Sequence, residues 1–195
     1  MILGITGGTG SGKTTLLDVI RECAGRVLDC DAIYHQLLQT DTALLQAIEM
    51  RFPGVVEQGG LNRKKLGSIV FSDKAALEDL NRITHSAVKR EVLCKLKEET
   101  TLTAIDAIGL FEGGLAELCD VTVAVTAPLE DRISRLMARD GITEEYAKSR
   151  ISAQHSDDWF REKCDRMLVN DGNIEAFKTK CLAFLFSLGI MKENQ

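Results

Sequence analysis

Residues 2–14 read ILGITGGTGSGKT, and this stretch decides the fold. Residues 2–6 form a short apolar run that predicts a buried strand, and from Lys13 onward the apolar residues recur at helical spacing. Between them, residues 7–14 match the pattern G-x-x-x-x-G-K-[ST] in full. Its glycines allow backbone N–H groups to turn toward an anion, and Lys13 adds a positive charge. Because the match lies between a strand and a helix, we expect a phosphate-binding loop rather than a chance glycine-rich turn.

This loop predicts the residues that hold a nucleotide. The helix that follows it directs the positive end of its dipole at the phosphates, and the hydroxyl of Thr14 is placed to bind Mg²⁺. We therefore expect ATP and Mg²⁺ as cofactors, with Thr14 as the metal ligand. The expected nucleotide-binding residues are Gly8, Thr9, Gly10, Ser11, Gly12, Lys13, Thr14 and Thr15.

Further apolar strands alternate with helical segments along the rest of the chain. Strands are expected at 26–30, 102–108, 121–127 and 166–169, with residues 31–52 helical, a loop at 53–60 and Asp41 as a helix N-cap. Such alternation predicts an α/β fold with three layers, in which helices flank a parallel five-stranded sheet, as in P-loop NTPases. Ligands of these folds gather at the carboxyl ends of the strands.

Composition limits the other possibilities. The chain has 195 residues, of which 45% are hydrophobic, and its net charge of −5 argues against a non-specific nucleic-acid binder. The longest apolar run, at 181–191, is too short to span a membrane, and no signal-peptide layout is seen, so we expect a cytoplasmic protein. The six cysteines form no CxxC pair and are expected to be reduced and mostly in the core.

Two carboxylates flank the end of the second expected strand. Asp29 and Asp31 stand two positions apart, so both could face the phosphate loop. We favour Asp31 as the group that orients or deprotonates an attacking hydroxyl, against the alternative that it caps the following helix. For Asp29, a place near the metal and a structural role are both open. Asp106, at the end of a later strand, is a weaker candidate for the water shell of the metal.

A basic helix follows the fourth expected strand. Arg132, Arg135 and Arg139 recur at helical spacing before Gly141. Arg132 is expected to lie in a solvated stripe, whereas Arg139, at the helix end, is placed for a lid that closes over the phosphates. Residues about 139–160 are expected to form this lid and to be mobile. No [NT]-K-x-D segment that would read guanine is present, which favours a small-molecule kinase over a GTPase.

Several segments together carry a resemblance to a known family. The phosphate loop is followed by Leu28-Asp29-Cys30-Asp31, and the sequence as a whole resembles dephospho-coenzyme A kinases along nearly its full length. The other matching segments are 61–66 (LNRKKL), 70–71 (VF), 83–85 (ITH), 110–112 (LFE), 135–140 (RLMARD), 150–154 (RISAQ) and 169–172 (VNDG).

The resemblance implies transfer of the ATP γ-phosphoryl group to the ribose 3′-hydroxyl of dephospho-CoA, which gives CoA and ADP. It implies Asp31 as the catalytic base, Lys13 and Arg139 as the other catalytic residues, and Asn170 near the adenine. It also implies a single P-loop kinase domain over 1–195, with an acceptor-binding helical lobe at about 32–98. The implied partner is a small-molecule substrate, with no nucleic acid or membrane and a monomer or weak homo-oligomer. The implied substrate-binding residues are Thr6, Asp31, Arg63, His85, Glu112 and Gln154.

The sequence departs from the family at two places near the acceptor. Ser86 follows His85 where the family has proline, and Ile108-Gly109 stand where it has proline and leucine. Both changes relax the local backbone. A kinase for another nucleoside or nucleotide is the alternative enzyme, and a non-catalytic module that uses ATP as a switch is the alternative from another class.

Overall fold

The computed structural model of the protein describes residues 1–190, which form a five-stranded sheet, a two-stranded hairpin and nine α-helices. The large sheet has the strand order β2-β5-β1-β6-β7. In it, β1 pairs in parallel with β5 and β6, and β6 pairs in parallel with β7. This confirms the predicted α/β fold. The strands are β1 (Ile2–Thr6), β2 (Arg26–Asp29), β5 (Thr103–Asp106), β6 (Val121–Thr126) and β7 (Arg166–Val169).

By its internal contacts the chain divides into two compact units. Among the described residues, the first comprises 1–27, 100–110 and 116–190, and the second comprises 28–99 and 111–115. The helices of the first unit are α1 (Lys13–Glu22), the short 3₁₀ turn Ala116–Leu118, α6 (Leu129–Asp140), α7 (Glu144–Ser152), α8 (Asp157–Lys163) and α9 (Ile174–Ser187).

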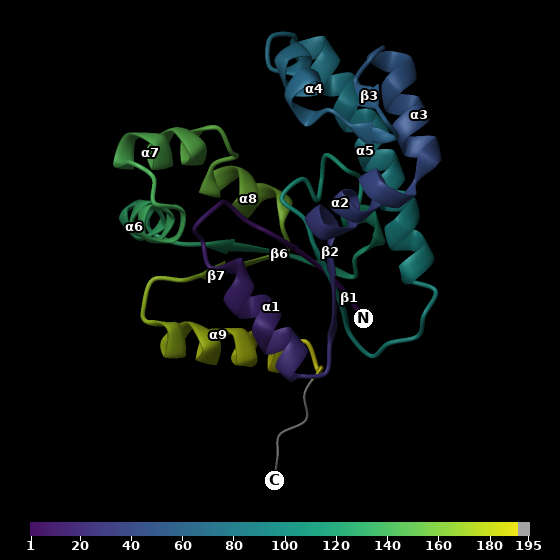
Figure 1. Ribbon diagram of the computed structural model, residues 1–195. Helices are drawn as coiled ribbons and strands as arrows, with labels where there is room; N and C mark the ends of the chain where they lie inside the picture. Colours follow the sequence, from purple (N-terminus) through teal and green to yellow (C-terminus); the bar gives the residue numbers. More distant parts are fainter. Residues whose placement is uncertain (191–195) are drawn as a thin grey trace. The chain divides into compact units, whose positions relative to one another are not determined.

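The core of the first unit lies between the sheet and two of these helices. Figure 1 shows α1 and α9 side by side on one side of β6 and β7, with α8 on the opposite side. Leu3 and Ile5 of β1, Leu16 of α1 and Leu185 of α9 are fully buried in one apolar cluster. The apolar run of β1 thus anchors the loop that follows it to the most deeply buried part of the unit.

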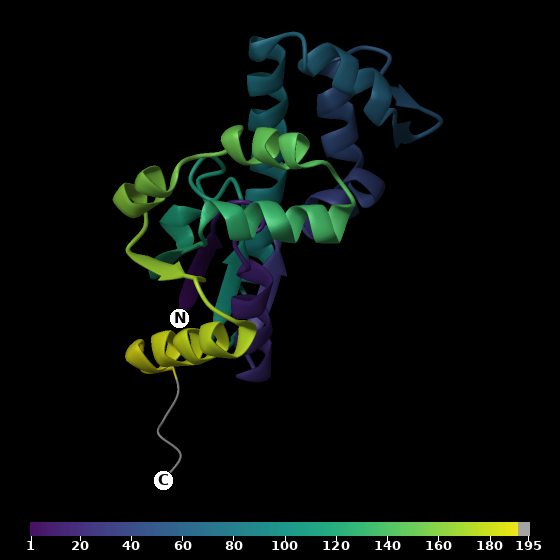
Figure 2. The same ribbon diagram turned by 90° about the vertical axis from the view of Figure 1, so that its left-hand side faces the viewer.

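The second unit is built around its longest helix. Figure 2 shows the long α5 (Lys74–Lys95) beside the shorter helices of this unit, and α2, α3 and α4 all contact it. Its remaining elements are α2 (Cys30–Thr40), α3 (Thr42–Arg51), the hairpin strands β3 (Val56–Glu57) and β4 (Gly60–Leu61), and α4 (Arg63–Val70).

Several boundaries differ from the sequence expectations. The second strand ends at Asp29, and Cys30 already begins a helix, because the Asp29 carboxylate caps it by accepting the N–H of Ala32 at 2.9 Å. The expected loop at 53–60 contains most of the β3–β4 hairpin, and α8 was not expected. The prediction that Asp41 caps a helix is confirmed, since it accepts the N–H of Leu44 at the start of α3.

None of the six cysteines, all of which lie within residues 1–190, is joined in a disulfide, as expected, but most of them are not in the core. Only Cys30 and Cys181 are buried, and Cys94 is exposed.

Within residues 1–190, the helices are too short or too polar for any of them to cross a membrane.

Replacing Asp41 with Ala should lower the stability of the second unit. The variant loses the cap of α3 and also the ion pair in which Arg90 of α5 donates to Asp41 at 2.5 Å. Loss of an N-cap costs about 1 kcal/mol, which corresponds to a fall of about 2–4 °C in Tm for a chain of this size. Thermal unfolding followed by circular dichroism measures the shift. Asp41→Asn, which keeps the cap but not the charge, should lose less than half as much.

Candidate active site: a phosphate loop held from outside

The loop at residues 7–12 connects the end of β1 to the start of α1. Gly7, Gly10 and Gly12 have φ values of +135°, +76° and +96°, which lie in the region that side chains rarely adopt. Neighbouring atoms also leave no room for a side chain at two of these glycines. A Cβ at Gly7 would lie 2.2 Å from the carbonyl oxygen of Val125, and one at Gly12 would lie 2.2 Å from Nδ2 of Asn170. Glycine is therefore required at both ends of the loop by conformation and by packing.

Three consecutive carbonyl groups of the loop accept hydrogen bonds from outside it. The carbonyl of Thr9 accepts from Nε of Arg132 at 3.0 Å. Arg135 donates through Nη1 to the carbonyls of Gly10 and Ser11, at 3.2 and 3.4 Å. The Ser11 carbonyl also accepts from Nδ2 of Asn170 at 3.0 Å. These contacts bind the acceptor groups of the loop backbone and so favour a conformation in which its N–H groups serve an anion.

The N–H of Thr9 already has a partner in this structure. It donates to Oε1 of Gln154, which follows α7, at a distance of 2.8 Å. Gln154 and Thr9, both predicted from the sequence as site residues, therefore lie in direct contact. Because Arg132 holds the carbonyl of Thr9, the N–H and the carbonyl of this residue are bound by two different segments.

Lys13 and Thr14 begin α1 directly after the loop. Nζ of Lys13 lies 3.0 Å from Oδ1 of Asp106 at the end of β5, and both side chains are 17% exposed. Thr14 is exposed. The hydroxyl of Thr14 in the first turn of α1 and the carboxylate of Asp106 at the end of β5 are oxygen donors of the kind that Mg²⁺ accepts, so these residues fit the metal that the sequence implies. Thr6, predicted as a substrate-binding residue, is buried and donates to the carbonyl of Ile108 at 3.1 Å.

Arg139 lies at the end of α6 and is bound by one acid, Asp140, rather than by the loop. Its guanidinium donates through Nε and Nη2 to the two carboxylate oxygens of Asp140, at 2.7 and 3.0 Å, and Arg150 donates to the same carboxylate at 2.6 Å. These hydrogen bonds lower the pKa of Asp140 to about 2. Asp140 therefore stays ionised at neutral pH and holds the last turn of α6 to α7.

Arg132 is placed differently from the sequence expectation. A solvated stripe was expected, but its side chain is only 7% exposed. Sequence reasoning missed Arg132 and Arg135 as loop contacts, because alternating charges on a helix are typical of a surface. The signal that was available is the position of α6: it follows β6, which pairs with β1, so its first turns lie near the loop that follows β1.

The other predicted site residues belong to the second unit. Asp31 is exposed in the first turn of α2, and the cap of that helix is Asp29, which removes the capping role from Asp31. Arg63 begins α4, and its Nη2 lies 3.2 Å from Nδ1 of His35. His85 is half-buried on α5, and Glu112 is exposed in the loop after β5.

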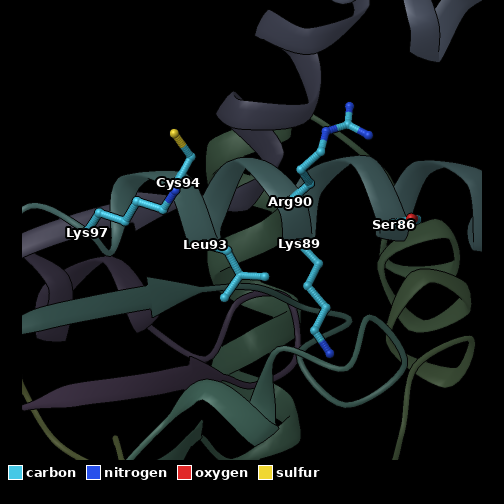
Figure 3. A pocket seen from close by; sticks show the side chains of 6 residues that line it. All are labelled: Ser86, Lys89, Arg90, Leu93, Cys94 and Lys97. Carbon is cyan, nitrogen blue, oxygen red and sulfur yellow. The ribbon is translucent and has the colours of Figure 1, made fainter.

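A groove runs along α5 immediately after His85. It has a volume of about 780 Å³. In Figure 3, Lys89 and Leu93 point to the same side of α5. Arg90 is already paired with Asp41. The groove therefore places cationic side chains beside the apolar surface of Leu93 and Cys94. The lining residues are Ser86, Lys89, Arg90, Leu93, Cys94 and Lys97.

The parallel sheet and the phosphate loop with its lysine, threonine and strand-end aspartate define a P-loop kinase class of protein. Comparison with known proteins gives the family within this class. The model of the dephospho-CoA kinase family matches residues 1–176. A dephospho-CoA kinase of Syntrophotalea carbinolica is 34% identical over 194 residues, which cover 96% of this chain and 92% of that protein.

Solved structures with the same fold are also found. A crystal structure of TT1252 from Thermus thermophilus has a TM-score of 0.80 and 34% identity, and the likeness covers 96% of this chain and 97% of that one. A dephospho-CoA kinase from Campylobacter jejuni, with a TM-score of 0.69 and 24% identity over 97% of this chain and 98% of that one, shares the fold. The chain belongs to the dephospho-CoA kinase family, and it is a kinase that uses ATP.

Replacing Gly12 with Ala should abolish most ATP binding, with affinity at least about tenfold weaker. The added methyl group meets Nδ2 of Asn170 and forces a left-handed conformation on a residue with a side chain, at a cost of about 1–2 kcal/mol for the conformation alone. Isothermal titration calorimetry measures the affinity. Gly189→Ala is the matched control: it has a φ of +71° but open space around it and lies outside the proposed lid, so it should retain ATP affinity. Equal affinity in Gly12→Ala and wild type would contradict the loop geometry described above.

Proposed function

We propose that this protein transfers the γ-phosphoryl group of ATP to the ribose 3′-hydroxyl of dephospho-CoA, giving CoA and ADP. The observation that carries the proposal is a complete phosphate loop, held by side chains from outside, in a chain that belongs to this family over most of its length. The choice of dephospho-CoA over other acceptors is supported by the family match and by the resemblance of the acceptor-side segments to those of dephospho-CoA kinases.

The donor side of the reaction is served by the loop and α1. Backbone N–H groups of residues 8–15 bind the phosphates, and Lys13 neutralises charge on the oxygens of the group that moves. In this structure Lys13 is paired with Asp106. A lysine on a flexible stem exchanges such a partner readily for a phosphate oxygen, because the carboxylate and the phosphate compete for the same donor.

The metal belongs to the same edge of the sheet. Thr14 would hold Mg²⁺ through its hydroxyl, and Asp106 would hold water of its shell, while the metal when bound neutralises the β and γ phosphates. Arg139 approaches the phosphates when the lid at about 139–160 closes, and the donors of its guanidinium stabilise negative charge on the transferred group.

The acceptor is received by the helical segment at about 32–98. Asp31 orients the 3′-hydroxyl and accepts its proton as the oxygen attacks phosphorus. Its exposure, and the fact that Asp29 takes the capping role, support this assignment. Arg63, His85 and Glu112 contact the acceptor, and Gln154 contacts it from the lid. The cations of the groove on α5 suit the anionic pyrophosphate of dephospho-CoA.

An acceptor screen tests the function directly. The protein is incubated with ATP and Mg²⁺ and with dephospho-CoA, adenosine, AMP, CMP or shikimate, and ADP release is measured. Only dephospho-CoA should give rapid turnover, with phosphorus NMR locating the new phosphate on the 3′ oxygen. Turnover with another acceptor, or none with any, would reject the proposal.

Lys13→Ala should lower the turnover with dephospho-CoA by about 100- to 1,000-fold, since one electrostatic donor to the transition state is lost. The exposed Lys163→Ala is its control.

Replacing Asp31 with Asn should lower kcat by about 100-fold or more and leave the Kd for ATP within twofold. The amide keeps the size of the side chain but cannot accept the proton of the attacking hydroxyl. Asp29→Asn is a matched comparison two residues away: asparagine caps a helix as well as aspartate does, so both stability and kcat should persist. Steady-state kinetics with saturating ATP decide the point. A large loss of kcat in Asp29→Asn, together with a normal kcat in Asp31→Asn, would assign the role of proton acceptor to Asp29 instead of Asp31.

A further inference from the structure

Arg132 of α6 has a guanidinium whose three nitrogens are in different situations. Nε donates to the carbonyl of Thr9 at 3.0 Å, and Nη1 lies 3.8 Å from the carboxylate of Asp157 at the start of α8. Nη2 is buried and has no hydrogen-bond partner within the described residues 1–190. The Arg132 side chain is thus only 7% exposed and positively charged, and its Nη2 donors have no acceptor in the part of the chain that the structure describes.

This guanidinium is packed directly against the phosphate loop. A Cβ at Gly8 would lie 2.1 Å from Nη2 and 2.8 Å from Cζ of Arg132. A Cβ at Gly10 would lie 2.8 Å from the backbone carbonyl oxygen of Arg132. The loop therefore has glycine at the two positions where α6 approaches it, and the charge sits directly behind the backbone that faces the phosphates.

Burial of the charged Arg132 guanidinium costs free energy unless a nearby anion stabilises the charge. Desolvation lowers the pKa of Arg132, and the carboxylate of Asp157 opposes this effect only in part. The other acid of the neighbouring turn, Asp131, lies 3.7 Å from Arg135. A charge in a medium of low dielectric acts more strongly on nearby anions than one in water does. The anions that approach this loop are the phosphates of the nucleotide.

We propose that Arg132 is a positioning residue for nucleotide phosphates. It fixes the peptide of Thr9 through the carbonyl and adds a buried positive charge behind Gly8, so that affinity for the polyphosphate depends on it and affinity for the nucleoside does not. The proposal rests on the proposed function only in that the loop binds ATP. Arg132 acts through the loop backbone and does not touch the reacting atoms.

The test uses the full-length chain with Arg132→Met, Arg132→Lys and the control Arg161→Met. Arg161 is 64% exposed on α8, where it pairs with Asp158. Calorimetry measures the Kd of ATP, ADP and inorganic tripolyphosphate, and competition with ADP measures that of adenosine. Arg132→Met should weaken the three polyphosphates by about tenfold or more and change adenosine by less than twofold, because a charge-assisted hydrogen bond and a buried charge are both lost.

The lysine variant separates the two contributions. Arg132→Lys keeps the charge but has no Nε in the geometry that reaches Thr9, so its ATP affinity should fall between those of wild type and Arg132→Met. Its salt dependence of ATP binding should stay close to that of wild type, whereas that of Arg132→Met should become shallower. In steady-state kinetics the KM for ATP should rise in both variants, with the KM for dephospho-CoA unchanged.

Several outcomes would overturn the proposal. The first is that Arg132→Met binds ATP as tightly as Arg161→Met does. The second is that Arg132→Met loses affinity for adenosine and for ATP equally, because an equal loss indicates general damage to the fold. If Arg132→Met does not fold, the selective loss of polyphosphate affinity in Arg132→Lys decides in the same way. A wild-type protein that binds ATP but transfers nothing to dephospho-CoA would reject the proposed function and leave Arg132 supported.

Discussion

The rest of the active site depends on the hydrogen bonds that hold the outer side of the phosphate loop. Each peptide of the loop has one donor and one acceptor, and a loop that binds an anion through its donors must place its acceptors elsewhere. Here the carbonyls of Thr9, Gly10 and Ser11 are bound by Arg132, Arg135 and Asn170. Two of these side chains carry a positive charge, so they stabilise the carbonyl dipoles and, through them, the electropositive inner side of the loop.

This arrangement explains why a short motif needs most of a domain to work. The three supporting side chains come from α6 and from the residue that follows β7, more than 100 residues after the loop. β6 and β7 bring them to the loop because β6 pairs with β1 and β7 pairs with β6. The order of strands is therefore a functional requirement: a different order would leave the carbonyls of the loop to water and its conformation unfixed.

Local patterns in the sequence were sufficient for much of the fold. The buried strands, the five-stranded sheet and the cap at Asp41 follow from hydrophobic runs and short polar motifs. The hairpin at 56–61 and the seven-residue α8 were missed, because neither is long enough to show a period. Arg132 was misjudged for a related reason. Its burial is set by a contact with Thr9, 123 residues earlier, and no local pattern reports such a contact.

The ion pair of Arg139 with Asp140 bears on the proposed closure of a lid over the nucleotide. A guanidinium at the end of α6 is bound by its neighbour Asp140, which Arg150 of α7 also binds. The Arg139 side chain is 61% exposed, and ion pairs so open to water contribute little to stability. Exchange of one carboxylate for the more highly charged phosphates of ATP therefore meets little resistance. Asp140 would still keep its contact with Arg150 after such an exchange, so α6 and α7 would stay joined while Arg139 turned toward the nucleotide.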